Sequence, residues 1–121
     1  MLVLFDSLTG NVERFVKQLG MRAMKIEEGL IIEEPFVLVT YTCGRGDVPS
    51  TTMKFLLRGN FINLRGVASS GNRNWIPLFA MAGERIASQF GVPLLGKFEL
   101  SGTKKDIEEI KNRIIELDNN S

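Results

Sequence analysis

Small polar residues separate an apolar run at residues 2–5 from a helical pattern, and their types suit the binding of an anion. Gly10 permits a tight turn, the hydroxyls of Ser7 and Thr9 can donate hydrogen bonds, and the amides that follow begin a helix. Neither G-x-x-x-x-G-K-[ST] nor G-x-G-x-x-G occurs at this loop, so one phosphate monoester fits better than a polyphosphate. A plain turn with a threonine or asparagine cap is the alternative. The candidate anion-binding residues are Ser7, Thr9, Gly10, Asn11 and Val12.

A second group of residues follows the strongest strand pattern of the chain. Gly44 and Gly46, at alternate positions, allow the backbone to approach a flat ligand or a peptide to flip. Cys43 is expected to line a pocket rather than act as a nucleophile, because the chain has no histidine to activate it. An ordinary glycine-containing loop before a helix is the alternative. The candidate residues are Thr42, Cys43, Gly44, Arg45 and Gly46.

A third group contains the only tryptophan, Trp75, which follows polar and glycine positions rather than an apolar pattern. A tryptophan placed in this way either covers the core or offers a stacking surface to an aromatic ligand. The asparagines and backbone amides could bind the polar edge of a heterocycle. An anion site beside two such loops indicates a phosphorylated aromatic cofactor, for which FMN is the simplest candidate. The candidate residues are Gly71, Asn72, Arg73, Asn74 and Trp75.

Apolar runs that alternate with helical patterns must position these three loops. Strands are predicted at residues 2–5, 23–26, 35–42, 66–69 and 92–98, the last at an edge because of Pro93 and Gly96. Helices are predicted to begin near Val12, Ser50 and Phe79, and a last helix is capped by Ser101 or Thr103. This pattern indicates an α/β, flavodoxin-like three-layer sandwich with a five-stranded parallel sheet in order 2-1-3-4-5. In that order the carboxyl ends of strands one, three and four are neighbours, so the three loops meet.

Length and composition predict a single domain, residues 1–121, in a reduced cytoplasmic setting. The net charge of +1, with acids and bases intermixed, argues against nucleic acid as the main partner. The apolar runs are too short to span a membrane, and the N-terminus lacks the pattern of a signal peptide. One cysteine and no histidine make an internal disulfide impossible and a metal site unexpected.

The loops resemble those of a known family. Ser7-x-Thr9-Gly10-Asn11 is similar to the phosphate loop of flavodoxins. The stretches 66–75 and 97–103 more specifically resemble signature stretches of the NrdI family, the flavodoxins that serve class Ib ribonucleotide reductase. The likeness extends over nearly the whole chain, including its short length.

The resemblance implies noncovalent FMN and a hydroquinone that reacts with molecular oxygen to supply an oxidant, superoxide, to the reductase small subunit. There the oxidant would help convert a dimanganese(II) centre to the dimanganese(III)–tyrosyl radical form, so the metal belongs to the partner. A separate electron donor would reduce the flavin. By the same resemblance residues 7–12 would hold the phosphate, residues 42–46 would border the N5 side, and residues 71–75 would form the other side. Residues 99–103 match without a cofactor role and are expected to shape the partner surface or cap the last helix.

Two departures from relatives bear on the flavin potential. Ile76 and Pro77 stand where glycine and often an acidic residue follow the aromatic, and Arg45 occupies a position that is often apolar or glycine. A cation near the flavin, and the loss of a carboxylate, would both favour the anionic reduced state and raise the potential.

Three alternatives stay open at this point. A general electron-carrier flavodoxin would more commonly be longer and strongly acidic. A phosphoacceptor receiver domain would match Asp6 and Lys97 superficially, but Thr42 stands where the acceptor aspartate should be. A cofactor-free interaction domain is disfavoured by the intact glycines and hydroxyls.

Overall fold

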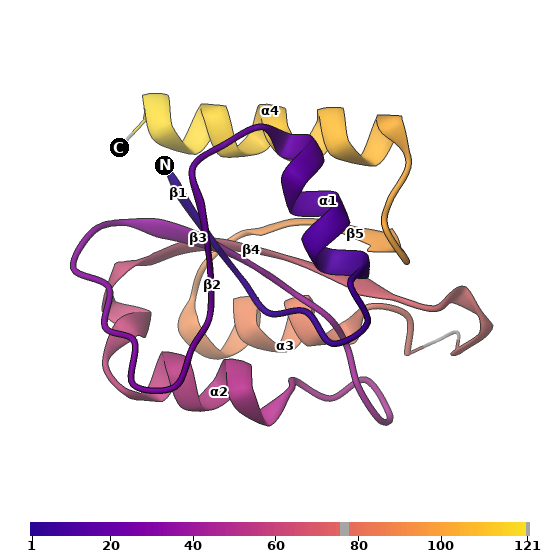
Figure 1. Cartoon of the computed structure of the whole chain (residues 1–121), viewed down its shortest axis with the longest axis horizontal. Coiled ribbons are helices and arrows are strands. Elements are labelled where there is room, and N and C mark those ends of the chain that lie inside the picture. The colour runs from indigo at the N-terminus through magenta and orange to yellow at the C-terminus, as the bar shows by residue number, and fades with distance from the viewer. Residues whose placement is uncertain (76–77, 121) are drawn as a thin grey trace.

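The computed structural model describes residues 1–75 and 78–120. Its centre is a five-stranded parallel sheet in the order β2-β1-β3-β4-β5 (Figure 1), so the predicted strand order is confirmed. Every pair of adjacent strands is parallel, and the carboxyl ends of all five strands therefore lie at the same edge of the sheet. The strands are β1 (Leu2–Phe5), β2 (Ala23–Lys25), β3 (Phe36–Thr40), β4 (Leu64–Gly71) and β5 (Leu94–Glu99).

Helices cover both faces of this sheet. Helices α1 and α4 lie on one face, and α2 and α3 lie on the other (Figure 1), which confirms the three-layer sandwich. The helices are α1 (Asn11–Leu19), α2 (Ser50–Leu57), α3 (Met81–Phe90) and α4 (Lys104–Asn119), with short 3-10 segments η1 (Asn60–Asn63) and η2 (Arg73–Trp75).

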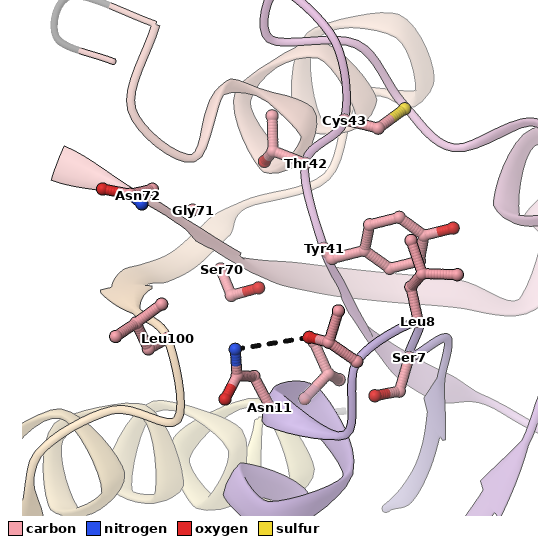
Figure 2. A pocket seen from close by; sticks show the side chains of 12 residues that line it. Ser7, Leu8, Asn11, Tyr41, Thr42, Cys43, Ser70, Gly71, Asn72 and Leu100 are labelled. Atoms are coloured by element: carbon pink, nitrogen blue, oxygen red, sulfur yellow. Dashed lines mark hydrogen bonds between the residues drawn. The ribbon is translucent and has the colours of Figure 1, made fainter. Parts of the chain in front are cut away.

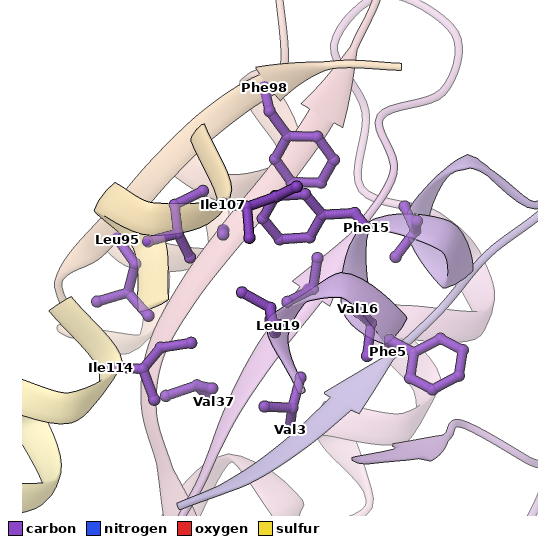
Figure 3. Packing of buried hydrophobic residues seen from close by; sticks show 14 residues of the cluster. Val3, Phe5, Phe15, Val16, Leu19, Val37, Leu95, Phe98, Ile107 and Ile114 are labelled. Atoms are coloured by element: carbon purple, nitrogen blue, oxygen red, sulfur yellow. The ribbon is translucent and has the colours of Figure 1, made fainter. Parts of the chain in front are cut away.

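Strands β1 and β3 are buried along their whole length, as expected for continuous apolar runs covered on both faces. The core on the α1–α4 face contains Phe15 from α1 and Phe98 from β5 (Figure 3). Their rings stack with centroids 3.8 Å apart, and both side chains are fully buried. The pair joins the helix after the first strand to the last strand of the sheet.

Strand β4 is longer than the predicted strand at residues 66–69. It runs from Leu64 to Gly71, so Ser70 and Gly71, which were expected in a loop, are strand residues. The reason is pairing: Ser69 lies opposite Thr40 of β3, and Ser70 and Gly71 lie opposite residues of β5. The ladder satisfies their backbone groups although their side chains are small and polar. Strand β3, in contrast, ends at Thr40, two residues before the predicted end.

A capping box begins the last helix. The Thr103 hydroxyl accepts a hydrogen bond from the Asp106 amide (3.1 Å), and the Asp106 carboxylate accepts one from the Thr103 amide (2.9 Å). Of the two predicted caps, Thr103 is therefore the one used. Among residues 1–75 and 78–120, no helix combines the length and apolar character needed to cross a bilayer.

Candidate functional site

Two adjoining pockets lie at the carboxyl ends of β1, β3 and β4. Their volumes are about 280 and 570 Å³, and Thr42, Gly71 and Asn72 line both of them. The three loops predicted to meet therefore line adjoining pockets, together called the groove, at the place where ligands bind in open α/β sheets. Its size is that of a cleft for a small molecule or cofactor.

The smaller pocket contains most of the predicted anion-binding residues (Figure 2). Ser7, Thr9, Asn11 and Val12 line it together with Thr42, Cys43 and the residues shared with the larger pocket. Sequence reasoning missed four lining residues, of which Leu8 and Leu100 are exposed apolar side chains. The signal available in the sequence was the position of these two leucines among polar loop residues. The four missed residues are Leu8, Tyr41, Ser70 and Leu100.

The turn into α1 leaves backbone amides at one end of this pocket. Gly10 adopts φ = 90°, the left-handed conformation that glycine favours, and α1 begins at the next residue. The Ser7 hydroxyl accepts a hydrogen bond from the Glu13 amide at 3.3 Å. Within the described part of the chain, the Asn11 and Val12 amides have no acceptor, as is usual in the first turn of a helix. These amides and the positive end of the helix dipole suit an anion.

Arg14, which sequence reasoning did not include, brings a cation to this loop. Its guanidinium donates to the Asn11 side-chain oxygen at 2.6 Å and to the Ser101 hydroxyl at 3.2 Å. A Cβ placed on Gly10 would lie only 2.9 Å from Arg14 Nη1. The spacing from Asn11 to Arg14, one helical turn, was the available signal, because residues three apart share a helix face.

The loop at residues 43–47 is a tight closed turn on the rim of the larger pocket. Cys43 and Asp47 exchange backbone hydrogen bonds of 3.0 and 2.7 Å, and Gly44 and Gly46 adopt φ of 53° and 80°. Arg85 of α3 anchors the turn by donating to the Asp47 carboxylate at 2.7 Å. The predicted need for glycine at both positions is thus explained by backbone conformation.

Arg45 lines the larger pocket together with Gly44 and Gly46. The Arg45 carbonyl accepts a hydrogen bond from Arg85 at 3.3 Å, so the direction of the Arg45–Gly46 peptide is fixed from α3. Thr42 also contacts α3: its hydroxyl accepts a hydrogen bond from the Ala82 amide in the first turn of that helix.

The third predicted group divides between the pockets and the surface beside them. Gly71 and Asn72 line both pockets, whereas Arg73 and Asn74 are not among the described lining residues. The Asn74 amide donates to the Asn72 side-chain oxygen at 2.9 Å. Trp75 ends η2, and the stacking role of its ring stays a prediction. Ile76 and Pro77 lie outside the described residues, so the expectation drawn from them stays a prediction.

Tyr41 lies in the wall of the smaller pocket, and its pKa is raised from the ordinary value by burial and, secondarily, by the Asp6 carboxylate. As the pH rises, Tyr41 loses its proton at a lower pH in the unfolded chain than in the folded one. The free energy of unfolding is therefore fully maintained below about pH 10 and falls as the pH rises through the higher pKa of the folded protein. Tyr41 is the only tyrosine, so phenolate absorbance reports it alone. We expect the pH midpoint of the phenolate absorbance change to be higher in the folded protein than in urea. An equal or lower midpoint for the folded protein would contradict the assigned burial of Tyr41.

A family model described as "NrdI Flavodoxin like" matches residues 3–112. The chain belongs to this family. Protein NrdI of Bacillus licheniformis is 52% identical over 107 residues, which are 88% of this chain and 81% of that protein. The SPbeta prophage-derived protein NrdI of Bacillus subtilis is 42% identical over 118 residues, 94% of this chain and 91% of that protein. The predicted membership of the NrdI family is therefore confirmed.

Solved structures place the NrdI-family chain in the flavodoxin fold. A short-chain flavodoxin associated with a non-canonical PDU bacterial microcompartment superposes with a TM-score of 0.75 at 18% identity, covering 98% of this chain and 96% of that one. The Fusobacterium nucleatum flavodoxin bound to flavin mononucleotide gives 0.61 at 14% identity, with 98% and 96% covered. At these identities the likeness establishes the fold alone.

Proposed function

We propose that the chain is a single FMN-binding domain, residues 1–121, that acts in the cytoplasm with the small subunit of class Ib ribonucleotide reductase. A separate electron donor would reduce the flavin. Bound FMN would then supply electrons to molecular oxygen and so provide superoxide, the oxidant for assembling the partner's dimanganese–tyrosyl radical. The observation that carries the proposal is the groove, two adjoining pockets lined by three strand-end loops, in a member of the NrdI family.

The phosphate end of the groove fits a monoester. The Asn11 and Val12 amides and the Thr9 hydroxyl border it, and Arg14 supplies positive charge from the next helical turn. The donor set is small and mostly backbone, which suits one phosphate group better than a chain of them. The sequence argument for an anion site therefore gains a cation that it did not require.

The remainder of the groove fits a flat ring. Gly71 lines both pockets and forms the floor between them; an added Cβ would stand 2.5 Å from the Ala80 amide nitrogen, so only glycine lets these two backbone segments pack this closely. Leu8, Tyr41 and Leu100 offer apolar surface on the phosphate side, and Gly44 and Gly46 allow close backbone approach on the other. Arg45 on the rim would favour a reduced, anionic ring and so raise its potential.

A partner surface beside the groove is available. Leu8 is 74% exposed and Leu100 is 52% exposed, and both also line the smaller pocket. Exposed apolar side chains at the mouth of a site are suited to contact another protein. In the proposed function they would border the path by which the oxidant reaches the reductase subunit.

An anaerobic reductive titration of the FMN-reconstituted protein, followed by absorbance, tests this function against the general electron-carrier flavodoxin. We expect flavin binding, bleaching without a second absorbing species that accumulates midway, and rapid recovery in air. Such an intermediate species, long-lived in air, would favour the electron carrier. No bound flavin would leave only the fold. Radical assembly on the manganese-loaded reductase subunit would then test the partner directly.

Gly10→Val tests the phosphate end. The substitution places a β-branched residue at φ = 90° and moves the Arg14 guanidinium. We expect FMN binding to weaken roughly tenfold, because relief of about 1–2 kcal/mol of strain would move the adjacent Asn11 and Val12 amides and the Arg14 guanidinium. Riboflavin, which lacks the phosphate, should lose much less affinity. Equal losses for the two ligands would contradict a phosphate site at this loop.

A further inference from the structure

Edge strand β5 carries two charged side chains that contact the segment between β4 and α3. Lys97 and Glu99 are two residues apart and therefore lie on the same face of the strand. Lys97 donates to the Phe79 carbonyl at 3.2 Å and pairs with Glu84. Glu99 accepts a hydrogen bond from the Arg73 amide at 3.0 Å. Both side chains thus bind main-chain groups at the borders of the loop that begins at Gly71.

The contact at Glu99 is part of a larger attachment. The second carboxylate oxygen of Glu99 lies 3.7 Å from Arg73 Nε, and the Arg73 guanidinium stands 4.7 Å from the Phe79 ring centroid. The Leu100 amide donates to the Gly71 carbonyl at 3.2 Å, and Leu100 adopts φ = 54°, an uncommon conformation for a branched side chain. The Leu100 amide thus holds the backbone before Asn72, and the Glu99 carboxylate holds the backbone after it. Leu100 keeps an unfavourable conformation while it makes this contact.

These contacts fix the backbone of the residue that lines both pockets. A trans peptide is planar, with its N–H and C=O pointing in opposite directions. Binding the Gly71 carbonyl determines the direction of the Asn72 N–H, and binding the Arg73 amide determines that of the Asn72 carbonyl. Glu99 does this from outside, since it is not among the described residues that line either pocket.

We infer that Glu99 is a positioning residue for the flavin: its carboxylate holds the Asn72–Arg73 peptide in the ligand-binding geometry before the ligand arrives. The inference rests on the proposed function and gives a cofactor-related role to a residue for which the family resemblance supplied none. The ion pair itself contributes little, because Glu99 and Arg73 are 40% and 58% exposed. The hydrogen bond to the main chain carries the effect, so a neutral acceptor of the same shape should retain most of it.

Three variants test the inference in the full-length protein. Glu99→Ala is expected to raise the Kd for FMN about tenfold, which corresponds to about 1.4 kcal/mol. Glu99→Gln keeps an acceptor oxygen and is expected to raise it no more than about threefold. Glu109→Ala, which removes another exposed glutamate from an ion pair on α4, is the matched control and should leave the Kd unchanged. Since Glu99 acts on the ring side, riboflavin affinity should fall by the same factor as FMN affinity.

A second measurement does not depend on bound flavin. Exchange of the Arg73 amide hydrogen in the apoprotein, followed by NMR, should be about tenfold faster in Glu99→Ala and close to the parent rate in Glu99→Gln. A parent that binds no flavin would refute the proposed function and, with it, the cofactor role of Glu99. If Glu99→Ala binds flavin as tightly as the parent, the inference alone is overturned. An unchanged exchange rate of the Arg73 amide hydrogen in Glu99→Ala would overturn it as well.

Discussion

Phe98→Ala is expected to lower the free energy of unfolding by about 3–5 kcal/mol, the usual cost of truncating a buried aromatic side chain. Phe98 is fully buried and stacks on Phe15 with the ring planes only 9° apart. The substitution would leave a cavity between α1 and β5 that neither rigid element can close. Because domains of this size are stable by about 5–15 kcal/mol, the variant should fold but unfold at much lower urea concentration.

Urea denaturation followed by far-UV circular dichroism measures the effect, with Phe61→Ala as the control. Phe61 also stacks on a phenylalanine, Phe90, with centroids 5.5 Å apart, but it is 41% exposed. Truncation of Phe61 leaves no buried cavity and should lower the free energy of unfolding clearly less than truncation of Phe98. Equal losses for the two variants would show that the Phe15–Phe98 contact is not a central part of the core.

Gly71→Ala is expected to weaken FMN binding about five- to 150-fold, which corresponds to about 1–3 kcal/mol of overpacking. The new methyl group would lie 2.5 Å from the Ala80 nitrogen and 2.9 Å from its Cα, so backbone rather than a flexible side chain must move. Ala80 lines the larger pocket and precedes α3 in the left-handed conformation, with φ = 50°. The floor of the groove would therefore shift together with the beginning of α3.

Gly91→Ala is the matched control because it alters the other end of the same helix. Gly91 adopts φ = 67° at the end of α3, and an added Cβ would meet no atom within 4 Å. Its backbone strain should lower stability by about 1–2 kcal/mol without changing FMN affinity. Fluorescence titration of FMN against both variants separates loss of the binding surface from general destabilisation. A Gly71→Ala protein that binds FMN like the parent would contradict the position assigned to the floor.

The order of the elements could be predicted from the sequence because each depends on nearby residues. The continuous apolar runs of β1 and β3 and the periodic spacing in α1 specify their own structure and burial. Parallel strands then place the three loops together through topology alone. The end of β4 was different: Ser70 and Gly71 have no strand-like pattern, and their pairing with β5 extends the strand.

The side-chain contacts around the site that could not be predicted join residues far apart in the chain. Arg14 reaches Ser101, and Glu99 reaches Arg73 across β5 and β4. Neither contact leaves a periodic or local pattern, since side-chain partners far apart in the chain are set by packing. Tyr41 was placed in a strand by its β-propensity, whereas β3 ends one residue earlier and leaves its ring in the pocket wall.

The hydrogen bond between Ser101 and Asn11 can form only late in synthesis of the chain. The Ser101 hydroxyl donates to the Asn11 side chain at 2.9 Å, a contact between residues 90 positions apart. A ribosome adds about 5–20 residues per second, so the loop that precedes α1 is made several seconds before Ser101, its hydrogen-bond partner. The loop at residues 7–11 therefore gains this contact only after Ser101 has been made, and in the proposed function FMN would bind to the completed chain.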